Sequence, residues 1–221
     1  MIASELLSEV VPAVHKDDKA AEALNWMDVF KISHLPIVDN DEYIGLISEV
    51  DIFDMNKPEI PVLEHNLSLE RPFVKNNQHI FEVVELASKL KLTAIPVLDE
   101  NENYLGLITI TDLAMEFAHL MSCESPGGII VLEVKINDYS LSEIAQIVES
   151  NDTKILSMYV RTVKPAEGIE IALKVNKTDI ASVIKTFERY SYKIISTYSE
   201  NSELDAILKD RFDSFLKYLN I

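Results

Sequence analysis

One stretch of this sequence is written twice. The segment HLPIVDNDEYIGLISEVD, residues 34–51, returns as AIPVLDENENYLGLITITD at residues 94–112. The copies align at an offset of 60, which one extra residue in the second turn raises to 61, so that Pro12 pairs with Pro72 and Gly45 with Gly106. Self-similarity at a fixed period indicates one supersecondary unit used repeatedly. We therefore expect repeats at residues 1–56 and 57–122.

Each repeat has the pattern of a β-α-β-β-α unit. A short extended segment surrounds Pro12 or Pro72, because the residue before a proline avoids the helical region. Apolar residues three and four apart then predict an amphipathic helix. Two short strands joined by a polar turn follow, at 35–38 with 43–47 and at 95–98 with 104–108. A second helix is expected to start at or just after Asp51 and Asp112.

The pattern changes after residue 122. The segment CESPGG, residues 123–128, reads as a linker, since proline and glycine break regular structure. Residues 129–200 then predict a β-α-β-β-α-β order, which is the ferredoxin-like plan. The expected strands are 129–136, 155–164, 169–175 and 192–198, and the expected helices are 141–150 and 178–190. Ser140 and Glu143 have the spacing of a capping box at the first of these helices.

Residues 201–221 predict a C-terminal amphipathic helix. Its apolar positions recur at helical spacing, namely Leu204, Ile207, Leu208, Phe212, Phe215 and Leu216. Such a stripe needs a surface to pack against. Two choices follow from the sequence: the sheet of its own domain, or a dimer interface. The fold class is therefore α+β, with one pseudo-symmetric module of two repeats, a ferredoxin-like domain and a terminal helix.

Composition excludes several classes of function. The chain has only five glycines, and neither a Walker loop nor a GxGxxG motif can be assembled from them. Residues 1–120 hold 22 acidic and 8 basic side chains, a net charge of -14, which disfavours binding to nucleic acid. No apolar run reaches the roughly 18 residues of a membrane span. With a single cysteine, Cys123, an internal disulfide is impossible, so we expect a reducing cytoplasm.

The end of each repeat carries the most informative side chains. Ser48 and Asp51, and likewise Thr109 and Asp112, place a hydroxyl and a carboxylate three residues apart where a helix begins. An ionised carboxylate is an acceptor only, so it suits the paired hydroxyls of a ribose, and the hydroxyl can meet a phosphate. Aspartate is also a favourable N-cap, which would stabilise the helix by about 1 kcal/mol without any ligand. Both interpretations stay open at this point.

These residues carry a resemblance to a known family. Residues 1–120 resemble a tandem pair of CBS domains, or Bateman module, through HLPIVD with GLISEVD and AIPVLD with GLITITD. The resemblance implies two clefts that bind AMP, ADP, ATP or S-adenosylmethionine, and a homodimer. It places the ribose at Asp51 and Asp112, and phosphate or ribose oxygens at Ser48 and Thr109. It also implies that the backbone at His34, Leu35, Ala94 and Ile95 faces the base, which is walled by Val11, Val14, Phe73 and Val74.

The two corners differ in charge. Between hydroxyl and carboxylate the first copy has Glu49, whereas the second has Ile110 and Thr111. A glutamate ~8 Å from a phosphate charge costs roughly 0.5 kcal/mol in a water-like dielectric. We therefore expect the second cleft to be the better site. Ligands of low negative charge should fit better than ATP, unless magnesium accompanies the triphosphate.

Residues 129–198 resemble an ACT domain, which often binds amino acids. The expected glycine is absent from the loop after the first strand, NDYSLSE, so pairing into a dimeric sheet is an equal alternative. A CBS pair followed by an ACT-like domain is similar to the acetoin-utilisation regulatory proteins of bacteria. The five histidines show no HExxH or other metal-ligand spacing, and we expect no catalysis. The sequence thus predicts a regulatory sensor that acts on a separate protein, with two alternatives: an amino-acid sensor, or a structural adaptor without ligand.

Overall fold

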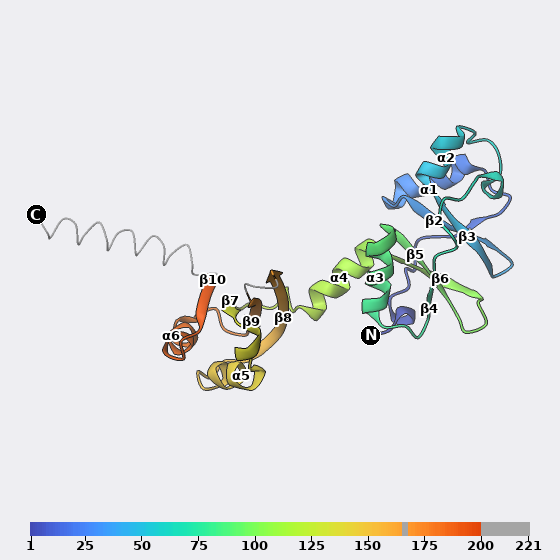
Figure 1. Ribbon diagram of the computed structural model, residues 1–221. Helices are drawn as coiled ribbons and strands as arrows, with labels where there is room; N and C mark the ends of the chain where they lie inside the picture. The colour runs from blue at the N-terminus through green and yellow to red at the C-terminus, as the bar shows by residue number, and fades with distance from the viewer. Residues whose placement is uncertain (165–167, 200–221) are drawn as a thin grey trace, which may run out of the picture. The chain divides into compact units, whose positions relative to one another are not determined.

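The computed structural model describes residues 1–164 and 168–199. The predicted C-terminal helix, residues 201–221, lies outside these ranges. The chain divides into two compact units, Met1–Glu116 and Phe117–Ile221, and each is described by itself. Figure 1 labels their helices and strands.

The first unit contains the two predicted repeats, apart from the end of their last helix, which continues beyond Glu116. Its first repeat consists of η1 (Ala3–Glu5), β1 (Val14–His15), α1 (Ala20–Phe30), β2 (His34–Asp39), β3 (Glu42–Ser48) and α2 (Glu49–Met55). The second consists of η2 (Val62–Glu64), β4 (Val74–Lys75), α3 (Ile80–Leu90), β5 (Ala94–Leu98), β6 (Tyr104–Thr109) and α4 (Ile110–Leu120). The order β-α-β-β-α is confirmed in both copies.

The sheets of the repeats have the same topology. Each is a three-stranded sheet, β1-β2-β3 or β4-β5-β6, in which the first pair is parallel and the second antiparallel. The hydrophobic core of the first repeat includes the inward faces of α1, β2 and β3, with Met27, Leu35 and Ile47 buried. Figure 1 shows α1 and α2 close to each other beside this sheet.

In each repeat, the segment before the first strand packs on the other repeat. Ala3 N donates to Gln78 O at 2.9 Å, and Ser4 N donates to Asn76 O at 3.0 Å, so residues before β1 pack on the second repeat. In the reverse direction, Val62 N donates to Asp18 O at 2.8 Å. We call residues 1–8 and 58–68 the crossing arms. They join the repeats into one folded module.

The glycine of each hairpin makes room for a crossing arm. A Cβ on Gly45 would lie 2.7 Å from Leu67 Cδ1, and a Cβ on Gly106 would lie 3.3 Å from Leu7 Cδ2. The sequence showed that these glycines recur at equivalent positions. In each repeat, glycine is needed at this position because a leucine side chain from the crossing arm of the other repeat packs against it.

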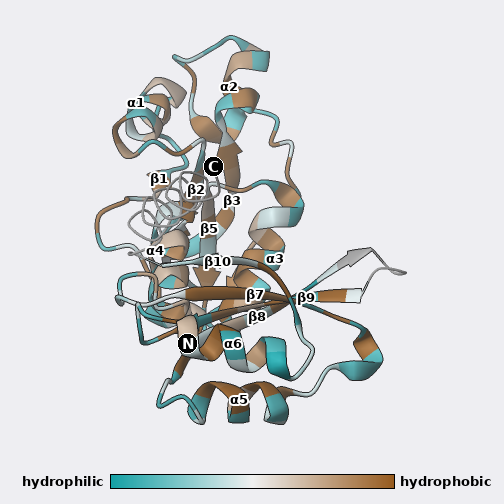
Figure 2. Ribbon diagram, turned by 90° about the vertical axis from the view of Figure 1, so that its left-hand side faces the viewer, coloured by the Kyte–Doolittle hydropathy of each residue, from teal (hydrophilic) through white to brown (hydrophobic). Residues whose placement is uncertain are grey.

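The second unit has the predicted ferredoxin-like order. Its elements are β7 (Ile129–Val134), η3 (Ile136–Asp138), α5 (Leu141–Glu149), β8 (Ile155–Lys164), β9 (Gly168–Val175), α6 (Ala181–Arg189) and β10 (Lys193–Tyr198). The four-stranded antiparallel sheet has the order β10-β7-β9-β8. Figure 2 shows α5 and α6 on the same side of it. The core between them includes Leu132, Ile144, Ile171, Val183 and Phe187.

Two local predictions in this unit need correction. β7 ends at Val134, two residues earlier than expected, because the chain turns into η3. The capping box at α5 forms only in part: Ser140 Oγ accepts from Glu143 N at 3.4 Å, but the Glu143 carboxylate accepts from the Tyr192 hydroxyl at 2.7 Å. Burial and this bond raise the pKa of Tyr192. A tertiary partner has therefore replaced the local one.

Within the described ranges, every helix is too short or too polar to cross a membrane.

Candidate functional site

The repeated serine or threonine and aspartate form a reciprocal capping box. Ser48 is the N-cap of α2, and its Oγ accepts from Asp51 N at 3.2 Å. The Asp51 Oδ2 accepts in return from Ser48 N at 2.9 Å and from Ser48 Oγ at 2.8 Å. Asp51 is thus the third residue of the helix. The prediction that the helix starts at or just after the aspartate is wrong by two residues, because the hydroxyl residue is the cap.

The second corner repeats this geometry. Thr109 Oγ1 accepts from Asp112 N at 3.1 Å, while Asp112 Oδ2 accepts from Thr109 N at 3.1 Å and from Thr109 Oγ1 at 2.7 Å. In both corners the hydroxyl hydrogen is directed at the carboxylate. A ligand could therefore use the hydroxyl oxygen only as an acceptor, unless this bond breaks.

The corners differ at the other carboxylate oxygen. Asp51 Oδ1 accepts from Ser68 N at 3.0 Å, and the side chain is buried, with Asp51 only 4% exposed. Asp112 is half-buried, and among the described residues no donor contacts its Oδ1. The reason lies in the crossing arms. Ser8 is the counterpart of Ser68, but its N–H donates to Leu107 O at 2.8 Å instead.

The start of α4 also leaves a backbone donor. Ile110 N donates to Thr93 O at 3.0 Å, and Asp112 N is taken by Thr109. For Thr111 N, the described part of the chain supplies no partner. Helix N-termini carry partial positive charge and attract anions. Asp112 Oδ1 and Thr111 N therefore place an open acceptor and an open donor at one helix start.

The other residues that the resemblance implied fall into two groups. Leu35, Ala94 and Ile95 are fully buried on β2 and β5, and Val14 and Val74 are buried on β1 and β4. The half-buried group is His34, Val11 and Phe73.

The His34 ring joins the two repeats. Its Nδ1 lies 2.9 Å from Thr93 Oγ1 and accepts from Thr93 N at 3.3 Å. Because a backbone N–H points at Nδ1, the neutral tautomer with its proton on Nε2 fits this geometry. Burial lowers the pKa of His34, although Asp51 and Glu49 oppose the shift. The contact keeps the strands β2 and β5 adjacent.

One residue that connects the repeats was missed at the sequence level. The Arg71 guanidinium lies over the rings of Tyr43 and Phe73, at 5.4 and 5.7 Å from their centroids. Its Nε donates to Tyr43 O at 3.0 Å, and its Nη1 pairs with Glu102 at 2.9 Å. Arg71 is the only arginine in residues 1–120, a signal that could have drawn attention to it. These contacts connect Tyr43 of the first repeat with Phe73 and Glu102 of the second, so Arg71 braces the two repeats against each other.

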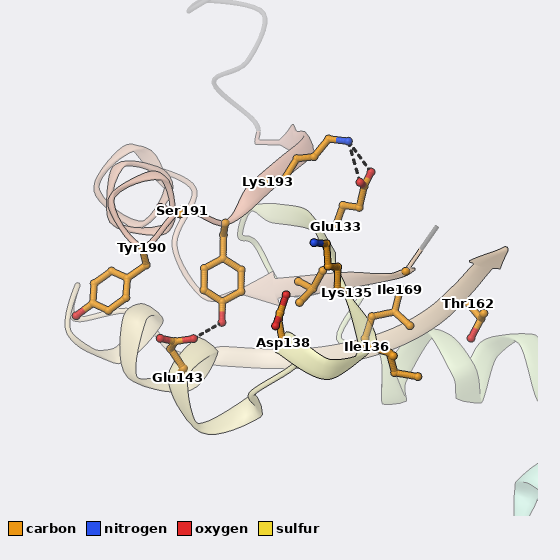
Figure 3. A pocket seen from close by; sticks show the side chains of 13 residues that line it. Glu133, Lys135, Ile136, Asp138, Glu143, Thr162, Ile169, Tyr190, Ser191 and Lys193 are labelled. Atoms are coloured by element: carbon orange, nitrogen blue, oxygen red, sulfur yellow. Dashed lines mark hydrogen bonds and ion pairs between the residues drawn. The ribbon is translucent and has the colours of Figure 1, made fainter. Parts of the chain in front are cut away.

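The second unit has a cavity of about 640 Å³ where β7, α5 and β10 meet. Its lining includes two polar pairs: Lys193 with Glu133 at 2.8 Å, which Figure 3 shows, and Tyr192 with Glu143 at 2.7 Å. Lys135 and Asp138, from the turn after β7, also line it. The loop NDYSLSE contributes to this wall although it lacks glycine. Charges of both signs thus surround one space.

A comparison with known families decides the nature of the first unit. The family model described as "CBS domain" matches residues 3–58 and 59–119. The chain belongs to the CBS domain family. The matched ranges together cover more than half of the chain, and they coincide with the two repeats that build the corners. The first unit is therefore a CBS pair.

Relatives of known description share only part of their length with this chain. Inosine-5'-monophosphate dehydrogenase of Methanocaldococcus jannaschii is 24% identical over 152 residues, which is 67% of this chain and 30% of that protein. The chain spans between 24% and 30% of the first curated relatives that it matches. Homoserine O-acetyltransferases match as well, so two unrelated reactions are represented. The likeness assigns neither reaction to this chain.

Solved structures show similarity over about half the chain. A CBS domain pair/ACT domain protein of Thermotoga maritima is 19% identical, with 54% of this chain and 98% of that one covered and a TM-score of 0.48. A protein of Vibrio cholerae assigned to acetoin utilization is 20% identical, with 56% and 95% covered and a TM-score of 0.49. CBSX2, solved in complex with AMP, is 16% identical, with 53% and 96% covered and a TM-score of 0.45.

Proposed function

We propose that the CBS pair is a regulatory sensor for an adenosine-containing molecule, which binds at the corner of Thr109 and Asp112. The ligands considered are AMP, ADP, ATP and S-adenosylmethionine. The observation that supports this corner is the unengaged Oδ1 of Asp112. A ribose hydroxyl could donate to this oxygen without displacing any protein donor, and Thr111 N could meet a ligand oxygen.

Energetics favour the second corner over the first. A hydrogen bond to a charged group is worth roughly 1.5–3 kcal/mol net. At Asp112 a ligand would gain such a bond directly. At Asp51 the ligand would first have to displace Ser68 N, which cancels much of the gain. The Ser48 and Asp51 corner therefore serves the fold of α2, and we assign it no ligand.

The charge of the corner restricts which of these ligands can bind well. Asp112 itself is anionic, and Glu116 follows one helical turn later, so a triphosphate without magnesium would meet repulsion. An acceptor facing a diol favours the nucleoside end of the ligand. AMP and S-adenosylmethionine therefore suit the corner better than free ATP does.

Binding of the ligand at the corner would regulate a partner protein through thermodynamic linkage. A ligand that binds one arrangement of the two repeats more tightly shifts the population toward it, and such couplings amount to about 1–3 kcal/mol. We propose a homodimer of this chain in the cytoplasm, acting on a separate, unidentified protein. Under this proposal the chain itself has no catalytic role.

The test compares the two aspartates. Ligand at a hundred times its Kd stabilises a protein by roughly 2.7 kcal/mol. We expect AMP, ADP, ATP with magnesium, or S-adenosylmethionine to raise the Tm of the full chain. Asp112→Asn should abolish the rise. Asp51→Asn is the matched control: it should lower the Tm without ligand, because Ser68 N and the capping box lose a charged acceptor, yet keep the ligand-dependent rise.

A second candidate function rests on the cavity of the second unit. Lys135 offers a positive group, and Asp138 a negative one, which suits the carboxylate and ammonium of an amino acid. The same melting experiment with the twenty amino acids tests it. If one of them raises the Tm and Asp138→Asn removes the rise while no adenosine compound acts, the amino-acid sensor replaces the nucleotide sensor. If neither class acts, the chain is an adaptor.

A further inference from the structure

The two crossing arms reach their hairpins in the same way and then diverge. In each arm a leucine packs against the hairpin glycine of the other repeat. One residue after this leucine, Ser68 N donates to Asp51 Oδ1 at 3.0 Å, whereas Ser8 N donates to Leu107 O at 2.8 Å. Equivalent donors in two copies of one unit therefore use different acceptors.

The residues that follow these donors show a second difference. We call residues 8–12 the strap, and residues 68–72 are its counterpart at the first corner. The counterpart is fastened at its far end, because the Tyr43 hydroxyl donates to Pro72 O at 2.8 Å and Pro72 is buried. In the strap, Pro12 is only half-buried. The strap is therefore held less tightly than its counterpart.

The equivalent of Tyr43 has a buried hydroxyl without a partner. Tyr104 corresponds to Tyr43 in the alignment of the repeats, and the two rings stack with 6.4 Å between their centroids. The Tyr104 hydroxyl oxygen is buried, and in the part of the chain that the structure describes no group forms a hydrogen bond with it. Burying a donor in this way is unfavourable. The acceptor that the alignment assigns to it is Pro12 O.

A third contact is missing because a side chain differs. At the first corner Arg71 Nε donates to Tyr43 O at 3.0 Å, and Arg71 Nη1 pairs with Glu102. The strap has Val11 at the position of Arg71, and this side chain carries no donor. The position of Glu102 corresponds to Asp41, an exposed carboxylate. The second corner thus lacks the arginine but has a carboxylate where the arginine would need one.

A second acceptor for Ser8 N lies near the first. Leu107 comes two residues before Thr109, whose backbone N–H donates to the Asp112 carboxylate at 3.1 Å. Two residues of a strand span about 6.6 Å. The first corner shows that this donor can reach the aspartate while the preceding leucine stays packed on the hairpin glycine. A change of acceptor therefore needs a movement of the strap alone.

We propose that the strap is an autoinhibitory segment with two positions. In the open position, which the structure shows, Ser8 N donates to Leu107 O, and Asp112 Oδ1 stays available to a ligand. In the closed position Ser8 N donates to Asp112 Oδ1 and the Tyr104 hydroxyl donates to Pro12 O, as the equivalent groups do at the first corner. A ligand that needs Asp112 Oδ1 binds only the open position, and this consequence rests on the proposed function.

A strap that is fastened more strongly tests the closed position. Val11→Arg supplies the guanidinium that the first corner has, and Asp41 lies at the position of its partner. Val10→Arg is the matched control, because it adds the same charge at a neighbouring side chain that is 71% exposed. Both variants leave Thr109 and Asp112 unchanged.

The first measurement needs no ligand. In NMR spectra of the isotope-labelled full chain, the scalar coupling across a hydrogen bond identifies the acceptor of Ser8 N. We expect coupling to the Leu107 carbonyl carbon in the parent protein and in Val10→Arg. In Val11→Arg the main coupling should be to the Asp112 side-chain carboxyl carbon. Leu107 as the main acceptor in all three proteins would overturn the proposal.

The second measurement is the affinity for AMP and for S-adenosylmethionine. The apparent affinity falls with the fraction of molecules that are open, so closing about nine molecules in ten weakens binding about tenfold. We expect a loss of this size in Val11→Arg relative to Val10→Arg. Tyr104→Phe removes the hydroxyl that only the closed position satisfies. Adding Tyr104→Phe to Val11→Arg should therefore restore most of the affinity.

The outcomes separate the strap from the sensor function. If Tyr104→Phe restores no affinity, the arginine itself obstructs the corner and the strap is not autoinhibitory. If Ser8 N changes its acceptor but neither compound binds the parent protein, the two positions of the strap stand and the sensor function fails. If the parent protein binds a compound while Leu107 stays the acceptor in Val11→Arg, the sensor stands and the strap fails.

A further pair of variants leaves the strap unchanged, which covers the case of a poorly folded Val11→Arg. Tyr43→Phe should lower the urea midpoint of the CBS pair, because the hydrogen bond to Pro72 O is lost. Tyr104→Phe should leave the midpoint unchanged, since its hydroxyl has no partner in the open position. Equal losses in the two variants would contradict the open position.

Discussion

At the scale of residues, one backbone donor distinguishes two corners that are nearly identical in sequence. Ser68 N reaches Asp51, whereas Ser8 N reaches Leu107 O, and only Asp112 keeps an open oxygen. The sequence predicts that a hydroxyl and a carboxylate lie together at the start of a helix, because their spacing is local, but it does not show that the hydroxyl residue is the cap. It does not predict the saturated Asp51, because its partner comes from a crossing arm 17 residues away. The sequence pattern therefore lacks the tertiary contact that saturates Asp51.

His34 gives a prediction about pH. Burial lowers the pKa of His34 in the folded chain, whereas in the unfolded chain the pKa is about 6.5. Below pH ~6.5 the unfolded chain therefore binds a proton at this residue more readily than the folded chain does. The contribution of His34 to stability is therefore full above pH ~7 and falls as the pH drops through about 6.5. Protonation of Nδ1 would also oppose the donor Thr93 N.

We expect His34→Gln to remove this part of the acid sensitivity. The measurement is the free energy of unfolding by urea between pH 7.5 and 5.5. The variant should lose less stability across this range than the parent protein does. Parallel curves for the two proteins would refute the assignment to His34.

At the scale of elements, hydrophobic periodicity predicted most of the helices and strands. It predicted β8 from Ile155 to Lys164 as the structure has it, and it placed the hairpins of both CBS repeats to within two residues. The errors lie at element ends. α2 starts earlier because Ser48 caps it, and Glu143 leaves its own cap for Tyr192. The residue at which a helix or strand ends depends on which hydrogen bonds form there. Some of the competing partners are distant in the sequence.

The linker supplies a prediction at this scale. A Cβ on Gly127 would lie 1.9 Å from the Val175 carbonyl oxygen, so the end of β9 passes too close for any other residue. Gly127→Ala should lower the free energy of unfolding of the second unit by about 1–3 kcal/mol, because the backbone must shift. Glu124→Gln, an exposed change in the same linker, should stay within about 0.5 kcal/mol. Equal urea midpoints for the two variants would argue against this close approach.

At the scale of the whole molecule, the CBS repeats are similar in fold but not independent. Residues 1–8 satisfy backbone groups of the second repeat, and residues 58–68 satisfy those of the first. Each repeat therefore loses backbone hydrogen bonds when the other repeat unfolds. Arg71 strengthens this dependence, because it contacts Tyr43 in one repeat and Glu102 in the other. The pair should therefore unfold as one cooperative unit, which is also what a sensor needs if occupancy of one corner is to affect both repeats.

A charge placed in the first crossing arm tests this cooperativity. Ala3 is 0% exposed and precedes the first CBS core in sequence, but its N–H is bonded to Gln78 O. Ala3→Glu would bury an unpaired charge, which should lower stability by about 3 kcal/mol or more. Ser4→Glu is the matched control, because that side chain is exposed and its backbone bond to Asn76 O survives. We expect hydrogen exchange in Ala3→Glu to speed up in α3 and β5 as much as in α1 and β2. Faster exchange confined to one repeat would mean that the repeats open separately, and occupancy at Asp112 could then not be transmitted through the arms.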